Sequence, residues 1–423
     1  MSDPLRAETA LRLAGERLLG SSRGRGEWGE GLGEVATALV LLCDLPQEVA
    51  EEVVADYGLA RSLRGQGWGP RLRTAGRHAT RRQRPARPTP TPPTVVACDA
   101  TVDLPDGRAH VSSVVFRDDA CEVTVSYAGV PAWAQHRGRT RRGGGIAGMP
   151  GQTSVADDTG ASVVAHFSGG GGDDGWEGRW QTDLPLSVHT RWLEIGGVRV
   201  ELGAAGASAL VRVEPLPDEP LAHRYLWHRA AVTEDGPPEN DPVLDALVEL
   251  GLIDPADPML DELAAVTDAM RRGRYGGQRP PRVTRQPWAS LSTRKSRRDG
   301  PTGTVPVAAA TPEFDGTVVV LYDLQAQPHG FTLQGRVVGE GAVMTGPFDE
   351  GLTGIPVAWW AEDDRGNSYL GEWGSHGGGG EEISGELLYR PGLDRKARHL
   401  TLLPTGLRHR AVIEVPLPEW GRP

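Results

Sequence analysis

Hydrophobic and polar residues alternate along two long stretches of the chain, and a period of two predicts β-strands. The alternating runs occupy residues 110–116, 121–127 and 198–202 in the first stretch and 317–322, 331–338 and 410–415 in the second. Gly and Asp turns separate these runs, which favours antiparallel strands joined by hairpins. The pattern predicts a mainly β protein with small α segments and two all-β domains, over residues 94–218 and 303–423.

A helical pattern precedes each β domain. Leucines lie near helical spacing over residues 5–19, within the predicted helical segment 1–63. In residues 219–271, Pro242 and Pro258 can each open a helix, because proline is tolerated in a first turn. We therefore expect a short helical segment, folded as small hairpins, before each β domain.

The two halves of the chain carry matching motifs in the same order. The matches are Asp157-Asp158-Thr159-Gly160 with Asp363-Asp364-Arg365-Gly366, the glycine runs 169–172 and 377–380, Gly178 with Gly385, and the Pro-Leu-Pro tails ending at Pro217 and Pro418. Because the spacing between partners is nearly constant, they indicate an internal duplication of the β domain. Residues 38–42 and 246–250 also match, which extends the expected duplication to the helical segments.

The Asp-Asp-x-Gly turn, the glycine run and the terminal Pro-Leu-Pro strand together resemble uncharacterised bacterial proteins with tandem immunoglobulin-like β-sandwich domains. The resemblance covers only part of each copy and carries no known activity. It implies two tandem antiparallel β-sandwiches with immunoglobulin-like topology, each preceded by a short helical segment.

A basic linker joins each helical segment to its β domain, at residues 64–93 and 272–302. No acidic residue occurs between 61 and 93 or between 271 and 298. The basic residues of interest are Arg71, Arg73, Arg77, Arg81, Arg82 and Arg84 in the first linker and Arg294, Lys295, Arg297 and Arg298 in the second. Such segments bury too little apolar surface to fold alone, so we expect the linkers to be extended or disordered. Clustered arginines can also contact nucleic-acid phosphates.

Charge and cysteine content narrow the class of protein. The formal net charge of −11 argues against a generic nucleic-acid binder, although a mean charge hides local basic patches. Cys43, Cys98 and Cys121 are an odd number in a long chain, which fits a reducing compartment better than a disulfide framework. The start of the chain lacks the apolar core of a secretory signal, and no segment is apolar for long enough to span a membrane. We expect a cytoplasmic protein.

Adjacent aspartates are the most repeated polar feature. Asp157, Asp158, Asp363 and Asp364 offer the oxygen ligands that a hard cation such as calcium prefers. The alternative is a hairpin turn, because Asp followed by Gly supplies local hydrogen bonds and positive φ. The turn is favoured, since a calcium site needs further oxygens that the sequence does not place.

Tryptophan is unusually frequent, with 12 Trp against 5 Phe. Trp176, Trp180, Trp359, Trp360 and Trp373 lie close to the repeated turn, and tryptophan anchors both interfaces and β-domain cores. Neighbouring residues of a strand point to opposite faces, so Trp359 or Trp360 should leave the core. These tryptophans are therefore a candidate binding surface.

No pattern for catalysis or a cofactor stands out. The histidines lack zinc-site spacing, and the glycine runs are flanked by carboxylates rather than by cations. The leading hypothesis is a non-enzymatic interaction or scaffold protein that binds another protein. One alternative is a hydrolase that uses the repeated aspartates at an inter-domain cleft, and another is a nucleic-acid-associated accessory protein that acts through the basic linkers.

Overall fold

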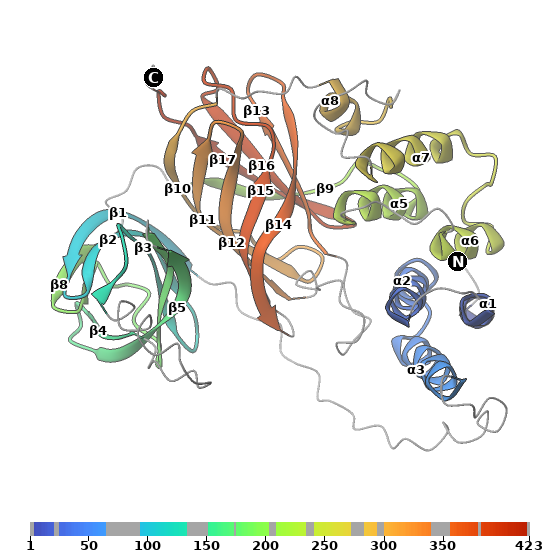
Figure 1. Ribbon diagram of the computed structural model, residues 1–423, viewed down its shortest axis with the longest axis horizontal. Helices are drawn as coiled ribbons and strands as arrows, with labels where there is room; N and C mark the ends of the chain where they lie inside the picture. The colour runs from blue at the N-terminus through green and yellow to red at the C-terminus, as the bar shows by residue number, and fades with distance from the viewer. Residues whose placement is uncertain are drawn as a thin grey trace.

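The computed structural model describes residues 4–20, 25–64, 94–132, 151–172, 175–202, 209–233, 241–271, 283–293, 300–339, 356–379 and 382–420. Within them the chain forms two curved antiparallel sheets and a group of helices. Figure 1 shows them in a row, with sheet 2 between sheet 1 and the helices. The prediction of a mainly β protein with two antiparallel β regions is confirmed.

Sheet 1 is one continuous sheet. Its strands are β1 (Thr94–Leu104), β2 (Gly107–Phe116), β3 (Cys121–Tyr127), β4 (Gln152–Asp157), β5 (Ser162–Gly172), β6 (Gly175–Thr182), β7 (Trp192–Ile195) and β8 (Val198–Glu201). They are hydrogen-bonded in the order β1-β2-β3-β6-β5-β4-β7-β8. Alternate residues such as Val123, Val125 and Trp180 fill a core on one face. Because β1 also contacts β8, the sheet curls until its two edges approach each other.

Sheet 2 repeats this arrangement and adds a strand. It contains β10 (Gly303–Ala310), β11 (Thr317–Gln327), β12 (Gly330–Gly339), β13 (Ala358–Asp363), β14 (Ser368–Gly379), β15 (Glu382–Tyr389), β16 (His399–Thr405), β17 (His409–Pro416) and β9 (Leu210–Pro215). The order is β10-β11-β12-β15-β14-β13-β16-β17-β9, so its first eight strands follow the order of sheet 1. Each region is thus a single curled sheet closed over its own core, and the immunoglobulin-like sandwich of two facing sheets is not confirmed.

Strand β9 departs from the expected domain boundary. It lies in the range 94–218 predicted for the first β domain, yet Val213 pairs with Ala411 of β17 in sheet 2. Val211 and Val213 pack against the core of sheet 2. The tail that ends at Pro217 therefore lies beside β17 in sheet 2. The strand of sheet 1 that corresponds to β17 in position is β8. The two tails look alike in sequence because both strands cover the same core.

The helices of both segments share one core, so they are not separate hairpins. They are α1 (Pro4–Gly20), α2 (Arg25–Cys43), α3 (Gln47–Arg64), α5 (Leu221–Val232), α6 (Pro242–Glu249), α7 (Pro258–Arg271) and α8 (Trp288–Thr293). Their buried residues form a cluster that also includes Trp360 and Leu403 of sheet 2. Helix α8 lies inside the predicted linker 272–302, so the expectation of an extended segment is wrong there. The indole of Trp288, 2% exposed, supplies the apolar surface that orders it.

Arg229 of α5 links the two helical segments. Its guanidinium lies 2.5 Å from the carboxylate of Asp241, which caps α6, and it also pairs with Glu34 of α2. Burial alone would lower the pKa of Arg229, but the charges of Asp241 and Glu34 outweigh it and raise that pKa above its ordinary value. The group therefore stays charged inside the helical core.

Candidate functional site

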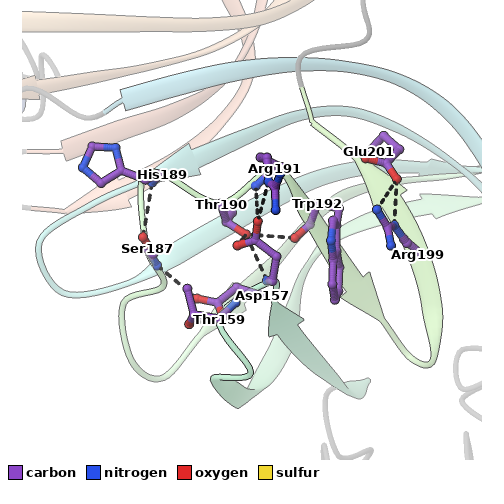
Figure 2. Close-up of polar contacts among 10 residues, drawn as sticks. Asp157, Thr159, Ser187, His189, Thr190, Arg191, Trp192, Arg199 and Glu201 are labelled. Carbon is purple, nitrogen blue, oxygen red and sulfur yellow. Dashed lines mark hydrogen bonds and ion pairs between the residues drawn. The ribbon is translucent and has the colours of Figure 1, made fainter.

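The first repeated aspartate builds the hairpin between β4 and β5 (Figure 2). Oδ1 of Asp157 accepts hydrogen bonds from the amide of Thr159 at 3.0 Å, from its hydroxyl at 2.6 Å and from the amide of Ala161 at 3.1 Å. Gly160 has a φ of 88°, in the region that glycine adopts most readily. The side chain of Asp157 thus closes the turn.

The second copy forms the same turn between β13 and β14. Oδ1 of Asp363 accepts from the amides of Arg365 and Asn367, both at 3.0 Å, and Oδ2 accepts from the hydroxyl of Tyr369 at 2.8 Å. Gly366 has a φ of 75°. The two turns therefore share both their backbone conformation and the role of the aspartate.

The second aspartate of each pair ties the hairpin to the loop before the next strand. Oδ1 of Asp158 accepts from the Thr190 hydroxyl at 2.6 Å, and Oδ2 accepts from the Arg191 amide at 3.0 Å. Asp364 accepts from the amide of Arg398 at 3.1 Å, in the corresponding loop of sheet 2. These bonds fix the start of β7 and of β16 relative to the hairpins.

The pKa values of Asp157 and Asp158 follow from their hydrogen-bond donors. Burial alone would raise the pKa of Asp157, but hydrogen bonds from Thr159, Ser187 and Ala161 hold it below its ordinary value. The Thr190 hydroxyl is the main cause that lowers the pKa of Asp158. Hydrogen-bond donors occupy the oxygens that a cation would need. In the described part of the chain, no three His, Cys, Asp or Glu side chains meet in a group that could hold a metal, and the geometry favours the turn interpretation.

A cation stacks on an aromatic ring beside the first hairpin. The Cζ atom of Arg199 lies 4.5 Å from the centre of the Trp192 ring, and its Nε donates to Glu201 at 2.7 Å (Figure 2). Sequence reasoning did not single out these residues. The sequence did contain a signal for this contact. Gly196-Gly197 forms the turn between β7 and β8, so the residues of the two strands come together.

The candidate tryptophan surface does not form as expected. Trp180, Trp359 and Trp360 are 1%, 3% and 7% exposed, and Trp176 and Trp373 are half-buried. Trp359 does point into the core of sheet 2 and Trp360 out of it, but Trp360 enters the helical core. Its ring centre lies 4.9 Å from that of Trp288 in an edge-to-face arrangement. Both faces of β13 are covered, so an alternating strand does not guarantee an exposed face.

The basic linker residues, from Arg71 to Arg84 and from Arg294 to Arg298, lie outside the described residues.

Strand register identifies a surface that the sequence analysis missed. Ser154 pairs with Val164 in sheet 1 and Trp360 pairs with Leu370 in sheet 2, each pair at the same distance from its Asp-Asp-x-Gly turn. In sheet 2 both residues pack against the helical core. Ser154 and Val164 are exposed, with Val164 at 48%. The helices lie on the far side of sheet 2 (Figure 1).

We call this surface of sheet 1, formed by Gln152, Ser154, Val164 and His166, the open face. The loop after β6 borders it, because the amide of Asp183 donates to the Val164 carbonyl at 3.1 Å. In that loop Leu184 is 61% exposed and Val188 is 46% exposed. An exposed strand face thus lies beside two exposed apolar side chains.

No helix in the described part of the chain has the length and apolar character needed to cross a membrane.

Comparisons with known proteins do not assign the chain to a family. No family model matches the chain, and no curated protein matches it. A solved structure described as a conserved domain protein from Bacillus anthracis aligns with 73% of this chain and 77% of its own, at 10% identity and a TM-score of 0.18. That similarity is too low to support any conclusion about fold or function.

Proposed function

We propose that this protein is a non-enzymatic interaction protein whose partner, another protein, docks on the open face of sheet 1. The observation that carries the proposal is the difference between equivalent faces of the two sheets. Sheet 2 uses the face around Trp360 and Leu370 to bind helices α5 and α8 of the same chain. The corresponding face of sheet 1 has the same strand geometry and is exposed.

The distribution of exposed apolar side chains supports this location. Among the described residues, the large hydrophobic side chains that stand exposed are Leu5, Val164, Leu184, Val188 and Leu210. Val164, Leu184 and Val188 belong to the open face or its bordering loop. Exposed apolar residues that gather beside polar ones mark interaction surfaces. Gln152 and His166 supply the polar part, since their side chains lie 3.3 Å apart and His166 also pairs with Asp183.

The contacts of the repeated aspartates do not favour the hydrolase alternative. It required carboxylates with raised pKa values that converge in a cleft. Each aspartate pair instead accepts hydrogen bonds within its own sheet, and the pKa values of Asp157 and Asp158 are lowered.

We also propose that the two sheets descend from one duplicated β unit. The shared strand order and the matching Asp-Asp-x-Gly turns support a common origin. The expected cytoplasmic location stays part of the proposal, since an odd number of cysteines in a long chain fits a reducing compartment.

Affinity purification of tagged protein from its native cells, after nuclease treatment, tests the function. Wild-type protein is compared with the double variant Val164→Asp, Leu184→Asp. Because a charge at an apolar contact disrupts docking, the double variant should recover about tenfold less partner. Leu210→Asp is the matched control, since Leu210 is 69% exposed on β9, away from the open face. Equal recovery with both variants would contradict the proposal.

A further inference from the structure

Five charged side chains from the two sheets meet where the sheets contact each other: Arg117, Glu122, Arg179, Arg336 and Glu382. Arg336 Nη1 lies 2.6 Å from Oε2 of Glu122, and Arg336 Nη2 lies 2.5 Å from Oε1 of Glu382. Arg117 Nε lies 3.0 Å from Oε1 of Glu122. Arg179 donates to the Ser384 hydroxyl at 3.4 Å. We call this group the junction cluster.

The junction cluster contains more positive than negative charge. Burial alone would raise the pKa of Glu122, but the charge and hydrogen bond of Arg336, with Arg117 and Arg179, lower it below its ordinary value. Glu122 is therefore ionised at neutral pH, and arginine is always charged. Three guanidinium groups face two carboxylates. Glu122 is 1% exposed, Arg336 is 3% exposed and the side chain of Arg117 is 18% exposed, so solvent compensates the excess only in part.

Several donor atoms of this cluster have no acceptor among the described residues. They are Nη2 of Arg117, Nε of Arg179, Nε of Arg336 and the hydroxyl of Tyr322. Tyr322 lies on β11 and is 5% exposed. It packs with Val115 and Val320, and Val320 pairs with Arg336 across the sheet, which places Tyr322 beside the cluster. Burial raises the pKa of its hydroxyl, so the hydroxyl keeps its proton. Buried donors without an acceptor are costly, so the arrangement favours a ligand that accepts hydrogen bonds.

We propose that the junction cluster binds one small monovalent anion, with chloride as the representative ligand, between Arg117, Arg179 and Tyr322. Because the cluster has one excess positive charge, the ligand should carry one negative charge. Because the N–H and O–H donors lack an acceptor, the ligand should accept hydrogen bonds. Val115 of sheet 1 and Val318 and Val320 of sheet 2 form the apolar contact next to the cluster, which favours a compact ion over a bulky one. The bound anion holds the two sheets together.

Chloride NMR line width on the full chain tests the proposal, because exchange with a protein site broadens the signal of the free ion. Wild-type protein should broaden the signal, and bromide should reverse the effect by competition. Tyr322→Phe removes one donor without changing charge, and Arg117→Met removes the excess charge, so each should reduce the broadening by at least half. Near-ultraviolet circular dichroism confirms that each variant is folded.

Arg199→Met is the matched control, because Arg199 is an exposed arginine of sheet 1 that pairs with Glu201. It should leave the broadening unchanged. Absence of broadening with wild-type protein would overturn the proposal. So would equal broadening by all four proteins, which would indicate nonspecific surface binding.

Discussion

Arg229 and His228 are neighbours on α5, and each places a polar side chain inside the apolar helical core. Arg229 satisfies two carboxylates from different helices, whereas His228 donates from Nε2 to the Pro356 carbonyl at 2.8 Å. Sequence reasoning found neither, because Glu34 and Pro356 lie far away along the chain and Asp241, 12 residues away, lies beyond the helix that carries Arg229. Only local chemistry, such as the Asp-Asp-x-Gly turn, could be predicted residue by residue.

Replacing Arg229 should destabilise the helical core strongly. Arg229→Met leaves Asp241 and Glu34 without their cation, and breaking a buried ion pair costs about 3–5 kcal/mol. Urea unfolding measures the loss. Arg12→Met is the control, since Arg12 forms a partly exposed pair with Glu8 of the same helix, and its replacement should cost at most about 1 kcal/mol. Similar losses in both variants would show that the buried pair has no special role.

His228 should make stability fall as the pH drops. Burial lowers its pKa below 6.5, although the Pro356 carbonyl and the charge of Asp315 act in the opposite direction. Below about pH 6.5 the unfolded chain binds a proton that the folded chain does not, so the free energy of unfolding decreases by up to about 1.4 kcal/mol per pH unit. His228→Gln, which keeps a donor for Pro356, should lose this contribution between pH 7.5 and 5.5. The exposed His189→Gln variant should retain it, and identical pH profiles would refute the assignment.

At the scale of elements, period-two alternation predicted most of the strands but not their partners. β9 has the alternation of a first-domain strand, yet it pairs with β17, because pairing depends on where the chain travels after residue 202. The same limit explains Trp360, since the sequence predicted only that Trp359 or Trp360 points away from the core of the sheet. Its burial depends on helix α8, which the linker composition did not reveal.

Disrupting β9 should affect sheet 2 and not sheet 1. Val213 packs against the core of sheet 2, so a charge from Val213→Asp should detach β9 and expose the edge of β17. Hydrogen exchange should then accelerate in residues 409–416, while β7 and β8 keep their protection. Arg212→Gln is the control, because Arg212 forms an exposed pair with Glu414. Faster exchange in sheet 1 instead would contradict this pairing.

At the scale of the whole molecule, the helices of both segments gather on sheet 2 and leave the equivalent face of sheet 1 exposed (Figure 1). The repeat in the sequence suggested two similar units side by side. The repeat could not show this asymmetry, because a duplicated sequence pattern does not indicate which copy packs against the helices. The open face can be recognised only from the strand register, which places Ser154 of sheet 1 at the position equivalent to Trp360 of sheet 2.

The two sheets should depend on Glu122 for their association. Glu122→Gln leaves Arg117 and Arg336 with Glu382 as their carboxylate partner, and loss of this buried charge should cost about 3–5 kcal/mol. The midpoint of urea unfolding should fall accordingly. Glu201→Gln, in an exposed pair with Arg199, should change it by about 1 kcal/mol or less. Equal midpoints for the two variants would exclude a stabilising role for the junction.

Site-specific photo-crosslinking in native cells is the most direct test of whether a partner protein docks on the open face of sheet 1. A benzophenone amino acid placed at Ser154 lies on the open face, and the same group at Leu210 lies on β9 of sheet 2. We expect a nuclease-resistant protein adduct from position 154 and none from position 210. An adduct from position 210 alone, or from neither position, would contradict partner binding through the open face of sheet 1.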